Sequence, residues 1–305
     1  MPGNTMEFQQ YLETFALGIT QVYEDELKMH QREYTAFLSE ATVDRWFDTE
    51  WVVSGFGIMP EKGIGAPVTT DRIIKGPTKQ HALQAWALGC VIDYEAIEWD
   101  LYGIFRNLAN ELAKSATDRY NVVGYSFLNN SFSAPSASYQ TFQGENMVTT
   151  AHTRLDGGTW SNQVAGNPGL GYLGFQQAKI LLGKLVNERG SYRKLSPRLL
   201  ITSWDQEWIA NELTMSGARP DQSNPAVVNN MKGIATHASP FLSTPQYWWL
   251  ESDKKEVNMG LRLGRKPQLT RDSDVRTRAL VMHSYCSFSG RVFDTRGLVG
   301  STGGA

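Results

Sequence analysis

Cysteine is scarce in this sequence, because the 305 residues include only two, Cys90 and Cys286. Two cysteines among apolar or small neighbours are too few for a disulfide framework, and they predict buried thiols in a reducing compartment. Long apolar runs are also missing, since no stretch reaches the roughly 18 residues that cross a bilayer. Residues 1–8 carry neither the basic nor the apolar segment of a secretory signal. These absences exclude a disulfide-stapled secreted domain and a protein with membrane-spanning helices.

Motifs for catalysis, cofactors and metals are equally sparse. The five histidines are scattered, with no His or Cys pair at metal-ligand spacing. His152, Asp156 and Ser161 are the residue types of a hydrolase triad, but they share one short glycine-rich loop without a Gly-x-Ser-x-Gly elbow. Residues 169–174 match Gly-x-Gly-x-x-Gly, but they follow a Gly/Asn loop instead of a strand. We therefore predict no catalytic residue, no cofactor and no metal site.

The charges nearly cancel, and their distribution is more informative than their sum. The net charge is -2 at pH 7, which argues against binding nucleic acid through bulk charge. Acids outnumber bases between residues 7 and 50, and bases outnumber acids between residues 154 and 198. An acidic arm can attract a basic body on another copy of the chain. Charge alone favours the simpler interpretation of two solvated faces, so both interpretations stay open.

The N-terminal part of the chain contains two segments without a core pattern of their own. Residues 8 to about 38 have helical spacing of apolar side chains on an acidic background, which predicts an amphipathic arm. Two β-rich stretches, at about 50–58 and 80–92, flank the Pro- and Gly-rich residues 59–67 and predict a long two-stranded excursion with a flexible tip. An isolated hairpin is only marginally stable in water. We therefore expect both segments to pack poorly against their own subunit and to lie on another.

The rest of the sequence predicts three helices and scattered strands. The longest helix is expected to begin at Asp93 and to continue to about residue 127 on one apolar stripe. A second helix is expected at about 173–188, and a third follows the capping-box pattern at 203–206. Without regular βαβ alternation, this pattern indicates an α+β fold. The further strands are expected at 197–201, 233–239, 247–250, 257–265 and 276–288.

Several short motifs follow one another in a fixed order. They are Met-Val-Thr-Thr-Ala-His at 147–152 with Gly-Gly-Thr at 157–159, the strand, cap and helix at 197–215, Lys-Gly-Ile at 232–234 before Ser-Pro-Phe-Leu at 239–242, Gly-Leu-Arg-Leu-Gly at 260–264, and Phe-Asp-Thr-Arg-Gly at 293–297. Together with the order of arm, excursion and long helix, these motifs resemble the major capsid (head) protein family of tailed bacteriophages, whose fold recurs in encapsulin shells and herpesvirus capsid floors. Each motif is weak alone, and the resemblance rests on their colinear order along nearly the whole chain.

The resemblance implies a tailed-phage major capsid protein fold with four parts. Two of them, the arm and the two-stranded excursion called the E-loop, contact neighbouring subunits in that family. The other two, called peripheral (P) and axial (A), form the body. The expected parts are the N-terminal arm at 1–48, the E-loop at 49–92, the P domain at 93–195 and 256–287 with its spine helix at about 93–127, and the A domain at 196–255 and 288–305.

By the same resemblance, the protein is a structural subunit of an icosahedral head, built from pentamers and hexamers of this one chain around double-stranded DNA. An encapsulin-like compartment is the alternative, and a soluble α+β enzyme is a remote one. Many members of the family carry a cleavable scaffolding region before the arm, whereas this chain starts at the arm. Either that region was removed or a separate scaffolding protein guides assembly, and Met1 favours the second. We therefore expect a separate scaffolding protein, with a portal and decoration proteins as further partners. We expect weak, non-specific contact with DNA, no contact with a membrane, and a location in the virion capsid after assembly in the host cytoplasm.

Contacts between subunits are therefore expected to carry the function. Some members of the family form covalent isopeptide cross-links, and Lys62, Lys75 and Lys79 qualify as donors by position only, so no cross-link is predicted. The contact candidates are the arm's apolar face and acidic cluster, the tryptophans of arm and E-loop with one lysine, and a basic group in the body. They are Tyr11, Phe15, Ile19, Val22, Glu24, Asp25, Glu26, Trp46, Trp51, Lys62, Trp86, Lys179, Lys184, Arg189, Arg193 and Lys194.

Overall fold

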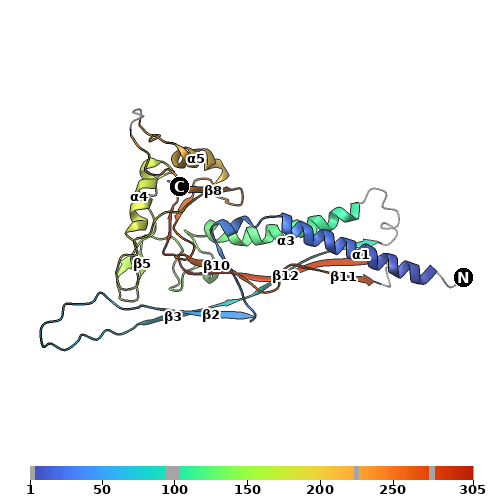
Figure 1. Cartoon of the computed structure of the whole chain (residues 1–305), viewed down its shortest axis with the longest axis horizontal. Helices are drawn as coiled ribbons and strands as arrows, with labels where there is room; N and C mark the ends of the chain where they lie inside the picture. Colours follow the sequence, from blue (N-terminus) through green and yellow to red (C-terminus); the bar gives the residue numbers. More distant parts are fainter. Residues whose placement is uncertain (1–3, 94–103, 223–226, 275–278, 305) are drawn as a thin grey trace.

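The computed structural model describes residues 4–93, 104–222, 227–274 and 279–304. Figure 1 shows an elongated platform of helices and strands, a lobe standing on one end of it, and a long hairpin along its lower side. The N-terminus lies at the free end of the platform, and the C-terminus lies in the lobe. The described helices are α1 (Asn4–Met29), α3 (Ile104–Asn129), α4 (Tyr172–Gly183) and α5 (Glu207–Met215), with 3-10 turns at Glu33–Ala36, Ala137–Tyr139 and Trp204–Gln206.

The platform is built on a sheet whose central strand is long enough to pair with several others. The N-terminal half of β12 pairs with β11 on one side and β4 on the other, and its C-terminal half pairs with β10, which in turn pairs with β1. The mixture of this sheet with packed helices confirms the predicted α+β fold. The strands of this first sheet are β1 (Ser39–Thr42), β4 (Gln84–Asp93), β10 (Asn258–Leu263), β11 (Gln268–Asp274) and β12 (Ala279–Asp294).

Helix α3 covers one face of the first sheet, because its apolar side chains form a continuous stripe. Tyr120 of α3 stacks on Phe288 of β12 with ring centroids 4.0 Å apart. Phe127 closes over Gly290, where a Cβ would approach its ring to 1.9 Å, so only glycine permits this contact. The sequence therefore brings the helix and the strand together through aromatic packing and one absent side chain.

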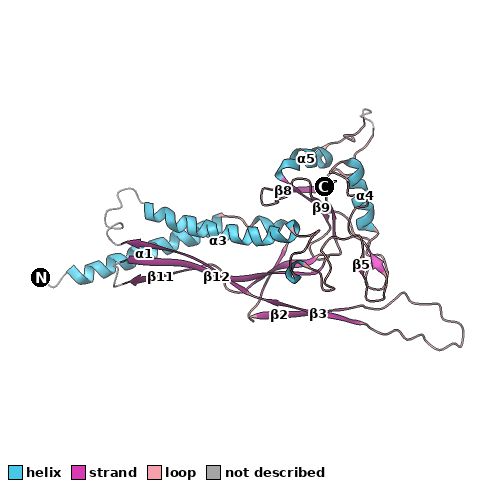
Figure 2. Cartoon of the chain, turned by 180° about the vertical axis from the view of Figure 1, so that it is seen from behind, coloured by secondary structure: helices cyan, strands magenta, loops and turns pink. Residues whose placement is uncertain are grey.

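The arm packs on its own subunit along most of its length. Ile19 and Tyr23 of α1 are buried against α3, β4 and β12, and Figure 2 shows α1 lying along α3. Tyr34, Phe37 and Leu38 are buried in the main core. The expectation of a poorly packed arm is therefore wrong for residues 19–38. The physical reason is that the apolar stripe of α1 covers helix and sheet surface of the same chain.

The lobe contains a second sheet, covered on one face by two helices. Side chains of α4 and α5 pack with alternate residues of its strands in one cluster, which includes Phe175, Leu213 and Leu200. The opposite face, through Ile201 and Trp249, joins the main core shared with the first sheet. The strand order is β13 (Leu298–Ser301), β9 (Trp248–Glu251), β7 (Leu199–Ser203) and β8 (Ala235–Ser239).

Several expected helix boundaries are wrong. Asp93 ends β4 and does not start the long helix; residues 94–103, where its first turns were expected, lie outside the described residues. Helix α4 ends at Gly183 instead of 188, because the chain turns back and Val186 bridges to Tyr192. The Ser203 side chain does not cap a helix, since its Oγ donates to the carbonyl of Pro245 at 2.9 Å.

Two strands of the first sheet were not expected, and one expected domain boundary divides a strand. Strands β1 and β11 are short and polar, and they carry no clear alternation that would have revealed them. The boundary between residues 287 and 288 lies inside β12, which continues to Asp294. The chain therefore leaves the first sheet after residue 294.

Glu251 predicts a specific pH dependence of subunit stability. This carboxyl is fully buried at the end of β9, where Arg198 Nη2 donates to Oε2 at 3.1 Å, and burial raises its pKa from about 4.5 to about 8. The folded state thus keeps a proton that the unfolded state releases, so stability is fully present below pH 4.5 and falls as pH rises through 8, by at most about 1.4 kcal/mol per unit. Urea unfolding of unassembled subunits between pH 5 and 8 measures this slope. Glu251→Gln should flatten it; an unchanged slope would contradict the assignment.

Candidate assembly interface

The E-loop is a hairpin that leaves the body. Strand β2 (Phe47–Val53) pairs with β3 (Lys75–Ala82) as an independent two-stranded sheet, and the intervening residues form a long loop that extends past the lobe (Figures 1 and 2). The expected second strand at 80–92 is wrong in one respect, because Leu83 separates β3 from β4 and only β3 belongs to the hairpin. The E-loop hairpin is therefore residues 47–82, and its extension away from the body agrees with the prediction.

Large apolar side chains of the hairpin are exposed to an unusual extent. Trp46 is 62% exposed and Trp51 is 60% exposed, and Lys62 is exposed at the tip. Exposed apolar residues that gather on one segment of a soluble protein mark a contact surface. The other exposed apolar side chains of this segment are Phe47, Val53, Phe56, Ile58, Met59, Ile64, Val68 and Ile73.

Charged side chains fix the root of the hairpin to the platform. Arg262 of β10 reaches Asp48 at 3.1 Å and Glu50 at 3.2 Å, and the buried Arg291 of β12 also pairs with Glu50. Lys79 of β3 donates to the carbonyl of Val292 at 2.9 Å. These contacts join β2 and β3 to the first sheet, so the hairpin has a rigid root and an unsupported tip.

Burial at this root changes the protonation of two basic groups. It lowers the pKa of Lys79 to about 8, with the charge of Arg291 adding to the effect. It lowers the pKa of His81 to about 4, with Lys79 and Arg291 again adding to the effect. The ammonium of Lys79 is held against backbone carbonyls of its own subunit, which makes it a poor donor for a cross-link to a neighbour.

Two of the five basic candidates form ion pairs within their own chain. Arg189 holds the hairpin midway along its length, through Asp71 at 3.1 Å and the carbonyls of Gly55 and Arg72. Arg193 pairs with Glu256 at 3.3 Å and with Asp294 at 3.7 Å. Both guanidinium groups therefore have partners within the subunit, which sequence alone does not reveal, and their contact with a neighbouring subunit stays a prediction.

The other basic candidates remain available to different degrees. Lys179 Nζ donates to the carbonyl of Asn230 at 3.0 Å and is half-buried. Lys184 and Lys194 are exposed. Lys194 has φ +54°, a left-handed conformation that is uncommon for a residue with a side chain and marks a tight turn. Lys184 and Lys194 are thus the most accessible basic candidates for a contact with another subunit.

Trp86 and Ile19 pack within their own subunit. The ring of Trp86 lies 5.8 Å from that of Phe288, and the guanidinium of Arg119 sits 3.7 Å from its centroid, so this tryptophan packs on its own sheet. Ile19 is buried in the arm's contact with α3. Val22 is half-buried beside it, and the side chains of Tyr11 and Phe15 lie outside the described part of the chain.

The acidic cluster of the arm lies on the outer side of α1. Asp25 pairs with Lys28 at 3.2 Å and Glu26 with His30 at 2.9 Å, both within the arm. Glu24 and Asp25 are exposed. The cluster therefore keeps the open, negatively charged face that a contact with a basic surface requires.

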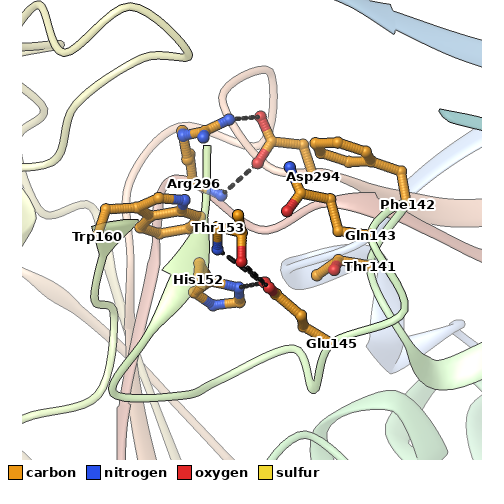
Figure 3. A pocket seen from close by; sticks show the side chains of 9 residues that line it. All are labelled: Thr141, Phe142, Gln143, Glu145, His152, Thr153, Trp160, Asp294 and Arg296. Carbon is orange, nitrogen blue, oxygen red and sulfur yellow. Dashed lines mark hydrogen bonds and ion pairs between the residues drawn. The ribbon is translucent and has the colours of Figure 1, made fainter. Parts of the chain in front are cut away.

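The glycine-rich loop around His152 is a structural element. The imidazole lies between Glu145 at 3.0 Å and Asn162 at 2.9 Å and stacks on Trp160 at 4.2 Å (Figure 3), and burial lowers its pKa. Ser161 Oγ instead donates to backbone carbonyls, of Thr149 and Gln163. The cavity beside His152 measures about 10 Å³, barely enough for one water molecule. These contacts hold the loop in its packed conformation.

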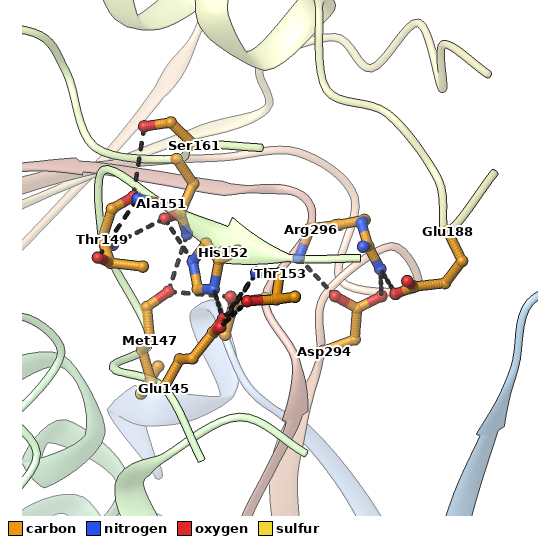
Figure 4. Close-up of polar contacts among 12 residues, drawn as sticks. Glu145, Met147, Thr149, Ala151, His152, Thr153, Ser161, Glu188, Asp294 and Arg296 are labelled. Atoms are coloured by element: carbon orange, nitrogen blue, oxygen red, sulfur yellow. Dashed lines mark hydrogen bonds and ion pairs between the residues drawn. The ribbon is translucent and has the colours of Figure 1, made fainter. Parts of the chain in front are cut away.

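A buried ion cluster next to this loop was not found from the sequence. Arg296 pairs with Glu188 at 2.5 Å and with Asp294 at 3.2 Å (Figure 4), and both Arg296 and Glu188 are almost fully buried. The guanidinium lies 4.6 Å from the ring of Trp160. No local pattern signals the pair of Arg296 with Glu188, because these two residues are far apart in the sequence, although Asp294 and Arg296 are only two residues apart.

Neither a cluster of metal ligands nor a membrane-spanning helix is present in the described ranges. In the ranges that the structure describes, no three His, Cys, Asp or Glu side chains gather as a metal site. None of the helices described there combines the length and the apolar character needed to cross a membrane.

The body is elongated (Figure 1), and its hairpin is held at the root by ion pairs while its outer part exposes apolar side chains. A family model described as phage capsid protein matches residues 76–301, and the chain belongs to this family. The prediction of a capsid protein is confirmed, and the protein is a structural subunit of a phage shell. No curated protein matches the chain.

Solved structures share the fold at low sequence identity. A structure from Microbacterium phage Oxtober96 has 9% identity and a TM-score of 0.57 over 89% of this chain and 91% of that chain. The capsid of bacteriophage JBD30, decorated with minor capsid protein trimers, has 11% identity and a TM-score of 0.57 over 70% and 92%. The SrpI encapsulin complex from Synechococcus elongatus PCC 7942 has 9% identity and a TM-score of 0.50 over 90% and 88%. At these identities the likeness shows the fold alone.

Proposed function

We propose that copies of this chain assemble as pentamers and hexamers into an icosahedral head that encloses double-stranded DNA. In this head, the E-loop hairpin of each subunit lies on its neighbour. The observation that carries the proposal is the hairpin with exposed Trp51 and a tip that has no core, fixed at its root by Arg262 and Arg291. Burying each large apolar side chain on a neighbour contributes roughly 1.5–3 kcal/mol.

An encapsulin-like compartment is the alternative within the same fold. The structural likeness extends to an encapsulin as well as to phage capsids, so the fold alone does not separate them. The family model favours the phage head. A catalytic role is a remote alternative, and the packing of His152 between Glu145 and Asn162 gives it no support.

The partners of such a head follow from the family and from the charge. We infer a separate scaffolding protein, a portal and decoration proteins, with assembly in the host cytoplasm. Contact with DNA is weak and non-specific, since the net charge of -2 supplies little attraction to phosphates.

The arm contributes through its free end and its acidic face. Glu24 and Asp25 are exposed and can meet a basic surface of a neighbouring subunit, where Lys184 and Lys194 are the exposed candidates. Exposed ion pairs are worth only about 0.2–1 kcal/mol each and weaken with salt. Reversing the acidic cluster to lysine should therefore weaken assembly less than removing the end of α1, and mainly at low salt.

Electron microscopy and sedimentation of the purified full chain, beside a variant without residues 1–16, test the proposal. The full chain should form capsomers and closed particles, whereas the shortened chain should stay folded and form no stable shells. Removing residues 1–38 would not be a fair test, because Tyr34, Phe37 and Leu38 belong to the core. A monomeric or dimeric full chain would overturn the shell function, and normal shells of the shortened chain would overturn the role of the arm.

A further inference from the structure

Helix α4 presents a mixed apolar and basic stripe to the outside. Leu173 and Ile180 are 63% and 49% exposed, and they lie on one face of the helix with Gln176, Gln177 and Lys184, all exposed. Residues 172–187 contain two lysines and no acid. The opposite face of α4 packs into the lobe. This outer stripe is therefore an apolar strip with positive charge at one end.

Helix α5 presents a face of the complementary kind. Trp208 is 83% exposed, and Trp204 and Met215 are exposed on the same side. Residues 204–215 contain three acids, Asp205, Glu207 and Glu212, and no lysine or arginine. All three acids are exposed. A tryptophan is a frequent centre of protein interfaces, and here it is surrounded by negative charge.

The second sheet places these two faces on opposite flanks of the lobe. Its strand order is β13-β9-β7-β8, α4 contacts β13 at one edge, and α5 contacts β7 and β8 at the other. Both helices cover the same face of the sheet, and Figure 1 shows them on different sides of the lobe. A surface on one flank and its complement on the other define a head-to-tail contact, which closes into a ring when the rotation between copies allows it.

We propose that the acidic tryptophan face of α5 on one subunit docks on the basic stripe of α4 on the next subunit of the same ring. The proposal rests on the shell function and names one contact within it. Trp208 lies against Leu173 and Ile180, and the acids of α5 lie near Lys184. Opposite charges favour this pairing over a two-fold contact of either face with itself, because like charges would then meet. Because Lys184 is then used in the α4–α5 contact, Lys194 is the exposed basic candidate left to meet the acidic face of the arm.

Pairwise cross-linking tests the geometry. In a chain whose two native cysteines are replaced by serine, assembled particles carrying Gln177→Cys and Glu212→Cys together, two exposed positions that leave Ile180 and Trp208 in place, are treated with a short bismaleimide. A denaturing gel should show a ladder up to pentamers and hexamers. Each single-cysteine variant is the matched control and should remain monomeric on the gel. Dimers from a single-cysteine variant would indicate a two-fold contact, and an absent ladder would show that the faces do not meet; either result overturns the proposal.

Point substitutions give a second readout. Ile180→Asp and Trp208→Glu alter exposed side chains, so the subunit should keep its melting temperature while the yield of particles falls at least tenfold. Trp208→Phe keeps an aromatic ring and should retain most of the yield. If the unmodified chain forms no particles, the shell function fails. If it forms particles and both acidic variants do so equally well, the shell function stands and the α4–α5 contact is wrong.

Discussion

Replacing residues 55–73 by Asn-Gly is expected to abolish shell assembly while the subunit stays folded. Ser54 and Ile74 already pair across the hairpin, with Ser54 N donating to the carbonyl of Ile74 at 3.0 Å, so a two-residue turn can close the shortened strands. The removed segment has no core of its own, and its exposed apolar side chains have only a neighbouring subunit to bury them. Thermal melting by circular dichroism checks the fold, and sedimentation velocity checks assembly.

Two tryptophans provide a matched control for this experiment. Trp51→Ala removes an exposed ring of the hairpin and should reduce assembly without lowering the melting temperature. Trp86→Ala removes a ring that packs on Phe288 and Arg119 in the same subunit, and it should lower the melting temperature first. Normal particles from the shortened hairpin, or the same behaviour from both tryptophan variants, would contradict the assigned role of the E-loop.

Arg296→Ala should produce the largest loss of subunit stability by a single polar substitution, about 3–5 kcal/mol, because it leaves Glu188 buried without a counter-charge. Urea unfolding of unassembled subunits measures this change. The double variant Arg296→Met with Glu188→Leu removes both charges and should recover much of the loss. As a control, Lys28→Ala breaks the exposed pair with Asp25 and should leave the free energy of unfolding nearly unchanged. Equal effects of the single and double variants would show that the buried charge is not the cause.

The sequence predicts the elements whose local pattern is strong. The spine helix follows from its apolar stripe, and the hairpin follows from Pro and Gly at its tip between two β-rich stretches. The arm shows where pattern reasoning stops, because the spacing of Ile19 and Tyr23 is the same whether the partner surface belongs to this chain or to another. Only the packed structure places these side chains against α3.

The predicted contact residues show the same limit of local sequence patterns. Trp51 on β2 and Lys62 at the tip of the hairpin are exposed. Arg189 and Arg193, in contrast, bind carboxylates and carbonyls within their own chain. A charge far from its partner in sequence carries no sign of that partner, and the same holds for the Arg296 cluster. The outer faces of α4 and α5 were missed for another reason, because an exposed and a buried tryptophan have the same local sequence signature.

The length of β12 has a mechanical consequence for a container under internal pressure. Its N-terminal half is bonded on both sides, to β4 and β11, and its C-terminal half continues the ladder with β10. Antiparallel ladders place their hydrogen bonds across the strand axis. A pull along β12 therefore loads many of these bonds in shear at once, and none can open before its neighbours. Strand β12 runs along the platform from its free end to the lobe (Figure 1). Tension in the shell is therefore carried along this strand, and the sheet is not opened one hydrogen bond at a time.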